Sequence, residues 1–226
     1  MDPGWLSNAY VVADRAGGSA VFIDSGAPVA PLLAAVDRLD VKVTHLLTTH
    51  GHSDHVAHEN EVVARFGVPV LAHPELGHGE TVTSGDLEIQ ALHTPGHSPD
   101  MLAFVVDREA CFTGDTLFAG AVGGTQDAFD DLRRSVMDTL MGLPDGTAVY
   151  PGHSEETTIG REWDDNQFIR VWRGLEPEGE DACRVRGEEA TLVLWARDYD
   201  GGGKAWVRFP DGRDAIVGGS HVQRTA

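Results

Sequence analysis

The sequence has little cysteine, few positive charges and no long hydrophobic run. Its two cysteines, Cys111 and Cys183, are too few for a disulfide framework and form no C-x-x-C pair. The longest apolar runs, such as residues 101–106, fall far short of the ~20 residues that cross a bilayer. Residues 1–5 lack the basic and apolar regions of a signal peptide. We therefore expect a cytoplasmic protein with reduced cysteines.

The scarcity of positive charge argues against nucleic acids and membranes as partners. The chain has 17 Lys and Arg residues against 36 Asp and Glu residues, a formal net charge of -19. A field of this sign repels phosphate backbones and anionic lipid surfaces. We expect no nucleic-acid partner and no membrane partner.

With 226 residues, 41% of them hydrophobic, the chain can bury one sizeable core. Short β-branched and apolar runs alternate with segments of helical periodicity, which predicts an α/β protein with a mixed sheet. The expected helices are one after Pro28 and those at residues 56–66, 128–141 and 157–172, and the expected strands are residues 8–13, 20–24, 43–48, 68–72, 87–93, 101–106, 110–113 and 147–150.

The composition changes near residue 176, where a stretch rich in Pro and Glu precedes a purely β pattern. In residues 204–209, apolar and polar side chains alternate as in a half-buried strand. We expect two domains, residues 1–175 and a small all-β module at residues 176–226, whose strand pattern resembles an SH3-type barrel. This module could have one of three roles: dimerisation, shielding of a cleft, or covering of the sheet.

The pattern H-x-H-x-D-H follows a predicted strand. Residues i and i+2 of an extended segment point the same way, so His50 and His52 can face one metal ion. Ser53 is expected to cap the next helix, and the turn there would direct Asp54 and His55 toward a second ion. The pattern therefore indicates two adjacent metal sites.

Three more candidate ligands share one local arrangement. His97, Asp115 and His153 each follow a predicted strand and a glycine. Glycine and proline form tight turns at sheet edges, where irregular backbone can direct side chains into a shared cleft. Asp24, after another strand, is expected to be either a turn former or a carboxylate that supports the ligands.

Over about residues 5–173 these motifs resemble the metallo-β-lactamase superfamily, and within it the glyoxalase-II-like hydrolases. The resemblance implies an αββα four-layer sandwich and a centre of two divalent metal ions. By the same resemblance, one ion is held by three histidines, His50, His52 and His97. A second ion is held by Asp54, His55 and His153, and Asp115 bridges the two ions.

Imidazole and carboxylate ligands suit zinc, and iron or manganese also fit. The implied reaction is hydrolysis of a thioester or ester by a hydroxide that bridges the two ions and that Asp54 orients. A thiolate leaves most easily without a proton donor, which favours thioesters. Serine and cysteine catalysis are disfavoured because there is no G-x-S-x-G motif and Cys111 lies in an apolar strand.

The chain departs from these hydrolases in two places. Gly124 stands where relatives carry arginine, and a β module replaces the helical C-terminal part that grips glutathione. We therefore expect a small thiol carrier other than glutathione. A homodimer is also expected.

The same motifs are compatible with other functions. One is a persulfide dioxygenase with a single iron held by His50, His52 or His97 and Asp115. A lactonase would use the same nucleophile. A non-enzymatic scaffold with a vestigial site is disfavoured by the filled ligand positions. Five further histidines are expected on the surface or packed in the interior: His45, His58, His73, His78 and His93. For His93, a supporting contact to His97 is the alternative. Trp195 and Trp206 are expected in the core or at the edge of the β module.

Overall fold

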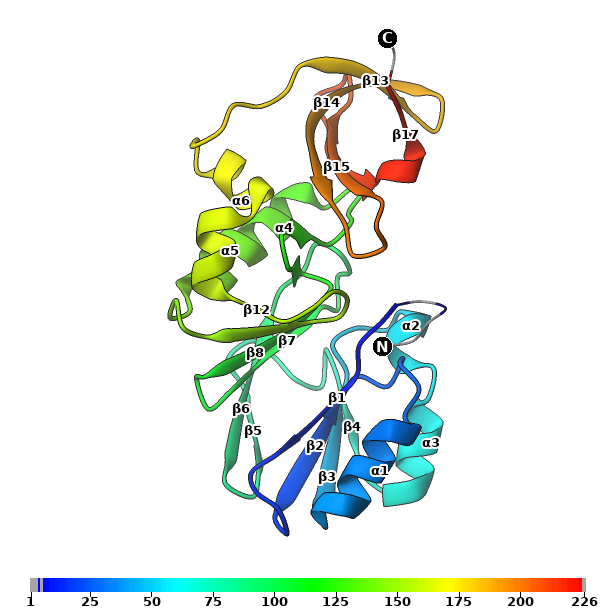
Figure 1. The fold of residues 1–226 in the computed structure, drawn as a ribbon, viewed down its shortest axis with the longest axis vertical. Coiled ribbons are helices and arrows are strands. Elements are labelled where there is room, and N and C mark those ends of the chain that lie inside the picture. The colour runs from blue at the N-terminus through cyan, green and yellow to red at the C-terminus, as the bar shows by residue number, and fades with distance from the viewer. Residues whose placement is uncertain (1–3, 5, 225–226) are drawn as a thin grey trace.

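The computed structural model describes residue 4 and residues 6–224. Most of residues 1–5, on which the expectation of no signal peptide depends, therefore lie outside the described residues. Within the described part of the chain, no helix is both long enough and apolar enough to span a bilayer. Two sheets lie face to face with helices outside them, and a third sheet follows at the C-terminal end (Figure 1).

The first sheet is covered on its outer face by helices α1 (Ala30–Leu39) and α3 (Glu59–Phe66) (Figure 1). Side chains of its second strand alternate between two cores: Ala20 and Phe22 pack with the helices, whereas Val21 and Ile23 pack between the sheets. In spatial order its strands are β1 (Tyr10–Ala13), β2 (Ser19–Ile23), β3 (Lys42–Leu47) and β4 (Val70–Leu71).

The second sheet completes the two inner layers. In β7, Phe104 faces the first sheet and Val105 faces the outer helices, so both faces of the strand are buried. The αββα four-layer sandwich is thereby confirmed. In spatial order the strands are β12 (Thr157–Thr158), β11 (Ala148–Pro151), β8 (Ala110–Gly114), β7 (Leu102–Val106), β6 (Leu87–His93) and β5 (Thr81–Ser84), and a separate hairpin is formed by β9 (Leu117–Phe118) and β10 (Ala121–Val122).

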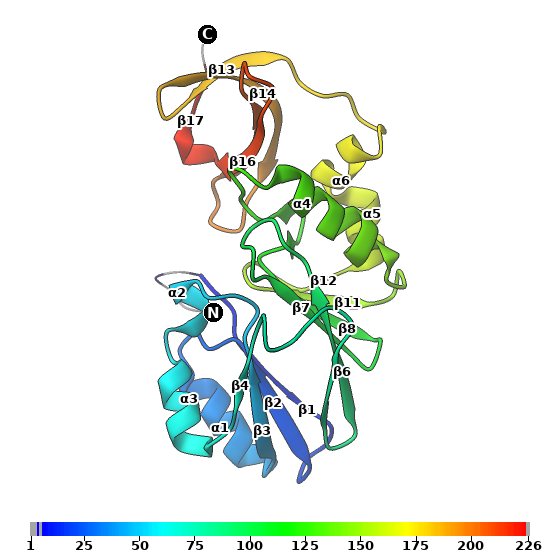
Figure 2. The same cartoon turned by 180° about the vertical axis from the view of Figure 1, so that it is seen from behind.

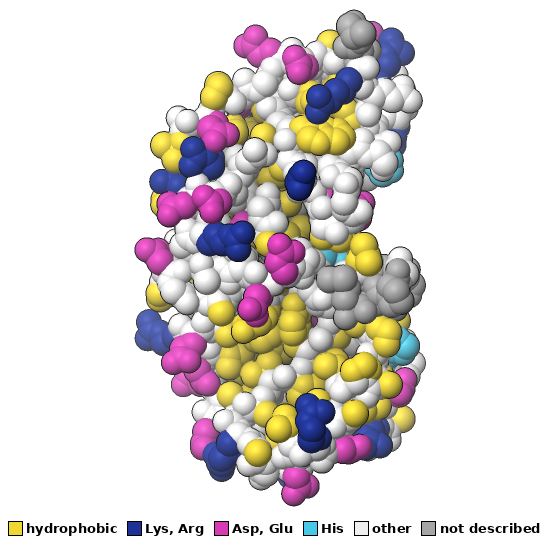
Figure 3. All heavy atoms as spheres, viewed as in Figure 1, with side chains coloured by type: hydrophobic (Ala, Val, Ile, Leu, Met, Phe, Trp, Pro, Cys, Tyr) yellow, Lys and Arg dark blue, Asp and Glu magenta, His cyan; other side chains and the backbone are white. Residues whose placement is uncertain are grey.

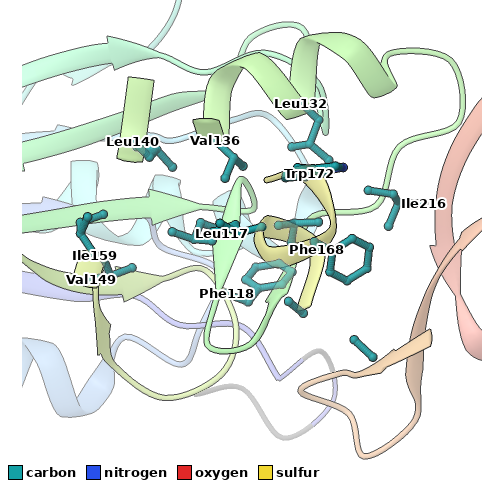
Figure 4. Packing of buried hydrophobic residues seen from close by; sticks show 14 of the residues in the cluster. Leu117, Phe118, Leu132, Val136, Leu140, Val149, Ile159, Phe168, Trp172 and Ile216 are labelled. Carbon is teal, nitrogen blue, oxygen red and sulfur yellow. The ribbon is translucent and has the colours of Figure 1, made fainter. Parts of the chain in front are cut away.

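The helices on the second sheet are more broken than the sequence predicts. The expected helix 157–172 is two helices, because Asn166 accepts hydrogen bonds from the first backbone amides of the second one. The expected helix 128–141 changes to π and then to 3-10 geometry. Figure 4 shows how these helices pack on the sheet through residues such as Leu132 and Phe168. The segments are α4 (Phe129–Arg134), the π-helical Ser135–Thr139, the 3-10 helical Leu140–Gly142, α5 (Ile159–Asp165) and α6 (Gln167–Trp172).

The expected helix 56–66 also divides. A short helix, α2 (Ser53–Val56), precedes α3. The expectation that Ser53 caps it is wrong: the residue before the helix is His52, whose extended backbone starts the turn, and Ser53 is the first helical residue. The redirection of the chain at this point therefore comes from the backbone turn and not from a serine cap.

The C-terminal module is one antiparallel sheet that curls on itself (Figures 1 and 2). One face encloses its own small core around Val207. From the other face, Trp206 and Ile216 join the core formed by α4, α6 and the second sheet, and Thr125 exchanges two backbone hydrogen bonds with Ile216. In spatial order the strands are β16 (Asp214–Gly218), β15 (Gly203–Arg208), β14 (Glu188–Arg197), β13 (Asp181–Val185) and β17 (Val222–Arg224), the last preceded by a 3-10 turn, Gly219–His221.

These contacts fix the module to the sandwich through a shared apolar core. Trp206 is 3% exposed, in line with the expected core position, whereas Trp195 is 36% exposed. The division at residue 176 and the SH3-type resemblance stay predictions, as does the homodimer.

Candidate metal centre

The predicted ligands lie on loops that follow the strands of both sheets. His50 and His52 come directly after β3, and the next two ligands lie on α2. His97 lies between β6 and β7, Asp115 directly after β8, and His153 directly after β11. The structure brings all of them together into overlapping groups at one end of the sandwich.

The first group consists of His50, His52 and His97, whose ligand atoms lie within 4.8 Å of one another. The Nδ1 atom of His52 is 2.9 Å from Nε2 of His50 and 3.0 Å from Nε2 of His97. His50 is buried, whereas His52 is exposed. This group therefore presents three ring nitrogens and is open to solvent on one side.

The second group consists of Asp54, His55 and His153, which meet the same 4.8 Å limit. Oδ2 of Asp54 lies 3.7 Å from Nε2 of His55 and 3.4 Å from Nε2 of His153. Both histidines are buried, and the Asp54 side chain is 26% exposed. The second group is therefore deeper in the protein than the first group and carries a carboxylate.

The Asp115 carboxylate lies between the two groups. Its Oδ1 is 3.3 Å from Nε2 of His55, and its Oδ2 is 3.4 Å from Nε2 of His153 and 3.5 Å from Nε2 of His97. One side chain thus contacts ring nitrogens of both groups, as a bridging ligand must.

Backbone carbonyls fix the orientation of two of these rings. Nδ1 of His97 lies 2.9 Å from the Gly124 carbonyl oxygen, and Nδ1 of His153 lies 3.0 Å from the Leu6 carbonyl oxygen. A carbonyl oxygen only accepts hydrogen bonds, so each Nδ1 carries the proton. In the neutral rings, Nε2 is then left with a free lone pair directed at the centre, as a metal ligand requires.

Asp24 supports the other two buried histidines. It accepts hydrogen bonds from the backbone amide and the hydroxyl of Thr49, at 2.8 and 2.9 Å, and lies 2.8 Å from Nδ1 of His55. Thr49 Oγ1 in turn lies 3.1 Å from Nδ1 of His50. Of the two roles considered for Asp24, these contacts favour the carboxylate that supports the candidate ligands.

Two buried polar atoms in the centre, Nε2 of His55 and Oδ1 of Asp115, have no hydrogen-bond partner among the described residues. Leaving such atoms unsatisfied away from water is unfavourable. Imidazole lone pairs and carboxylates converge on the same space, and this donor set is the one that zinc and neighbouring divalent metals prefer. The residues therefore fit a divalent cation.

The pKa values of the buried side chains differ between the two groups. Burial and the nearby charge of His55 lower the pKa of His50 to about 3. Burial would also lower the pKa of His55, but Asp24 and Asp115 outweigh it and raise that pKa to about 11. Burial opposes ionisation of Asp115, yet its close contacts with the His153 and His55 rings hold its pKa well below the usual range. Without a cation, protons on His55 and His153 offset the carboxylates of the second group, whereas His50 of the first group stays neutral.

Glycine at position 152 is required by close approach. A Cβ atom on Gly152 would lie 2.3 Å from Oδ1 of Asp115 and 2.7 Å from Cε1 of His55. Any larger residue would therefore push the Asp115 carboxylate or the His55 ring out of place. At position 152, the glycine that precedes a predicted ligand is therefore needed for packing as well as for the turn.

The remaining histidines lie outside all three groups of candidate ligands found among the described residues. His93 is bonded through Nε2 to the Pro99 carbonyl oxygen and stacks on His73 at 4.5 Å, so it supports no ligand directly. His78 is exposed and accepts a hydrogen bond from the His93 amide.

Sequence reasoning missed Tyr199, which lies between β14 and β15 in the C-terminal module. Its ring stacks on that of His153, with ring centroids 4.2 Å apart and an interplanar angle of 9°. The only local signal is an aromatic residue between two aspartates before a glycine-rich turn. In Figure 3, the surface has a notch directly below the C-terminal module.

Comparisons with known proteins agree with this geometry. The family model of the metallo-beta-lactamase superfamily matches residues 2–81. An uncharacterized protein of Aquifex aeolicus is 34% identical over 193 residues, covering 71% of this chain and 90% of the relative. A hydroxyacylglutathione hydrolase of Rhodopseudomonas palustris is 35% identical over 181 residues, covering 75% of this chain and 67% of the relative.

Among solved structures, the chain is similar to TTHA1623 in a di-iron-bound form, with a TM-score of 0.63 and 30% identity. The match covers 74% of this chain and 98% of that one. These matches show that the chain belongs to the metallo-β-lactamase superfamily.

Proposed function

We propose that the protein is a metallohydrolase with two divalent cations that cleaves a thioester or an ester. The observation that carries this proposal is the position of Asp115, whose two carboxylate oxygens contact histidines of both groups. A carboxylate shared in this way is what a paired centre needs and what a single site does not. The hydroxyacylglutathione hydrolase relative supports the choice of a thioester.

His50, His52 and His97 would hold one cation, Asp54, His55 and His153 the other, and Asp115 would contact both. Cations bound there would polarise the substrate carbonyl and lower the pKa of a water molecule toward neutrality.

The protein side chains supply orientation and proton acceptance. Asp54 is half-buried beside the second group, and a hydrogen bond from His153 lowers its pKa, so it is ionised at neutral pH. An ionised carboxylate at the edge of the centre can accept a hydrogen bond from water and orient it toward a substrate. A cysteine nucleophile is disfavoured, because burial raises the pKa of the Cys111 thiol to about 12.

The first group is where the substrate carbonyl would enter, because His52 is exposed there. A thiolate leaving group needs no proton donor, which favours a thioester over an amide. We propose zinc as the native metal; the di-iron form of TTHA1623 makes iron the main competitor. A cytoplasmic location is likewise proposed, and both cysteines are free and buried.

Metal analysis combined with a substrate panel tests the proposal. The purified protein would be analysed for zinc, iron and manganese, then assayed on thioesters of glutathione and of other small thiols, and on lactones. We expect two ions per chain and hydrolysis of at least one thioester or ester. One iron per chain with oxygen uptake on a persulfide would instead show the dioxygenase, and a protein that binds no metal under any of these conditions would refute both enzymes.

A further inference from the structure

The loop between β14 and β15 reaches from the C-terminal module to the second group. The Tyr199 ring lies parallel to that of His153, and Phe118 meets both rings edge-on, at centroid distances of 5.6 Å to His153 and 5.5 Å to Tyr199. His153 is 2% exposed. Two aromatic side chains, one of them from the module, therefore enclose this candidate ligand.

A buried ion pair holds the loop in place. Nζ of Lys204 lies 2.9 Å from Oδ2 of Asp198, and the two side chains are only 9% and 5% exposed. The Lys204 ammonium also lies over the Phe118 and Tyr199 rings, 5.5 and 5.6 Å from their centroids. A hydrogen bond from the Gly201 amide to the Asp198 carbonyl closes the turn. Tyr199 is thus presented to His153 by a fixed loop.

The orientation of His153 depends on what it contacts outside the centre. The hydrogen bond to the Leu6 carbonyl sets the direction of Nδ1, but a single bond of this kind does not by itself oppose rotation of the ring about the bond. A parallel ring at 4.2 Å blocks this rotation and excludes water from one face of the imidazole. Hydrogen-bonded partners that orient a ligand contribute about 10- to 100-fold to metal affinity, and we take the lower end of this range for a stacked ring.

We propose that Tyr199 is a positioning residue for His153, so that the C-terminal module completes the second cation site. This inference rests on the cation binding in the proposed function, but not on the identity of the substrate. It gives the module a role in the centre, beyond covering the apolar face of the sandwich.

Cation affinity measured on the full chain tests the proposal without any substrate. A His52→Ala background removes a ligand of the first group, so that titration of the metal-free protein with Co²⁺ against a chelator reports the second group. In this background Tyr199→Ala should weaken binding about 10-fold. Tyr199→Phe, which keeps the stacked ring, should restore affinity to within about twofold of the parent. Arg197→Ala, an exposed change at the end of β14 just before the Tyr199 loop, is the matched control and should bind as the parent does.

Equal Co²⁺ affinity in Tyr199→Ala and its parent would overturn the proposal. If the alanine variant loses its cooperative thermal transition, Tyr199→Leu replaces it, since leucine keeps bulk without a planar ring; weakened binding then supports the proposal and parental binding overturns it. A wild-type protein that binds two cations but hydrolyses none of the panel would refute the proposed hydrolase alone. Unchanged affinities in an active thioesterase would refute the role of Tyr199 alone.

Discussion

The two halves of the centre differ in what surrounds their ligands. The first group, His50, His52 and His97, has only imidazoles and opens to solvent at His52. The second group contains a carboxylate and two buried histidines, and it is backed by Asp24 and by an aromatic ring from another part of the chain.

This difference suggests a division of labour. An open set of imidazoles leaves room for a substrate to approach, whereas a buried set with carboxylates holds a cation firmly and keeps its geometry. We therefore expect the second group to bind its cation more tightly, and to be more sensitive to changes in residues that do not touch the metal.

The largest effect should come from the residue that joins the two halves. Asp115→Ala removes the carboxylate that contacts both groups, so activity should fall to background and the metal content below that of wild type. Elemental analysis and a hydrolysis assay check this. His78→Ala, at an exposed position outside the centre, is the control and should change neither quantity. Equal metal content in Asp115→Ala and wild type would contradict the bridging role.

A methyl group placed against the bridge should act almost as strongly. Gly152→Ala puts a Cβ atom 2.3 Å from Oδ1 of Asp115, so the carboxylate or His55 must move. We expect loss of most activity and of one cation per chain. Gly146→Ala is the matched control, because its Cβ atom would have no neighbour within 4 Å. Wild-type activity in Gly152→Ala would show that the centre tolerates displacement.

The support behind the second group can be weakened without touching a ligand. Asp24→Asn keeps the shape of the side chain but removes the charge beside Nδ1 of His55. We expect the affinity for the second cation to fall about 10- to 100-fold, with a smaller change at the first. Competition titration with a chelator measures both. Equal weakening of the two sites would remove the distinction between the halves.

The two halves should also respond to pH in opposite directions in the metal-free protein. The pKa of His50 is lowered from 6.5 to about 3, so the folded state binds fewer protons there and loses stability as the pH falls below 6.5. The pKa of His55 is raised from 6.5 to about 11, so its contribution is full below 6.5 and is lost as the pH rises toward 11.

We therefore expect the melting temperature of the metal-free protein to be highest near pH 6.5. His50→Gln should flatten the acid side of the profile and His55→Gln the alkaline side. Calorimetry on chelator-treated protein from pH 5 to 9 would show this. A profile that rises steadily across the range in wild type would contradict the assigned shifts.

The sequence predicts which side chains converge because the pattern that places them is local. Two histidines spaced by one residue after a strand, and glycine before His97, Asp115 and His153, are patterns that backbone geometry makes meaningful on its own. The four layers follow for a similar reason, since alternation within short strands reports which faces are buried. Helix breaks were not predicted, because the cap at Asn166 looks like any polar residue within a periodic run.

Supporting contacts were harder to predict because they join distant parts of the chain. Tyr199 and His153 are brought together only by the packing of the module on the sandwich. Asp24 could be identified as a polar residue after a strand, but its three hydrogen bonds depend on how β2 and β3 lie side by side. The Leu6 and Gly124 carbonyls that fix the imidazoles carry no side-chain signal.

Anomalous diffraction from crystals grown with excess zinc would test the paired centre most directly. Two peaks should appear, one within bonding distance of the three histidines of the first group and the other beside Asp54, His55 and His153, with Asp115 touching both. A single peak, or none with the imidazoles turned apart, would contradict a paired cation centre.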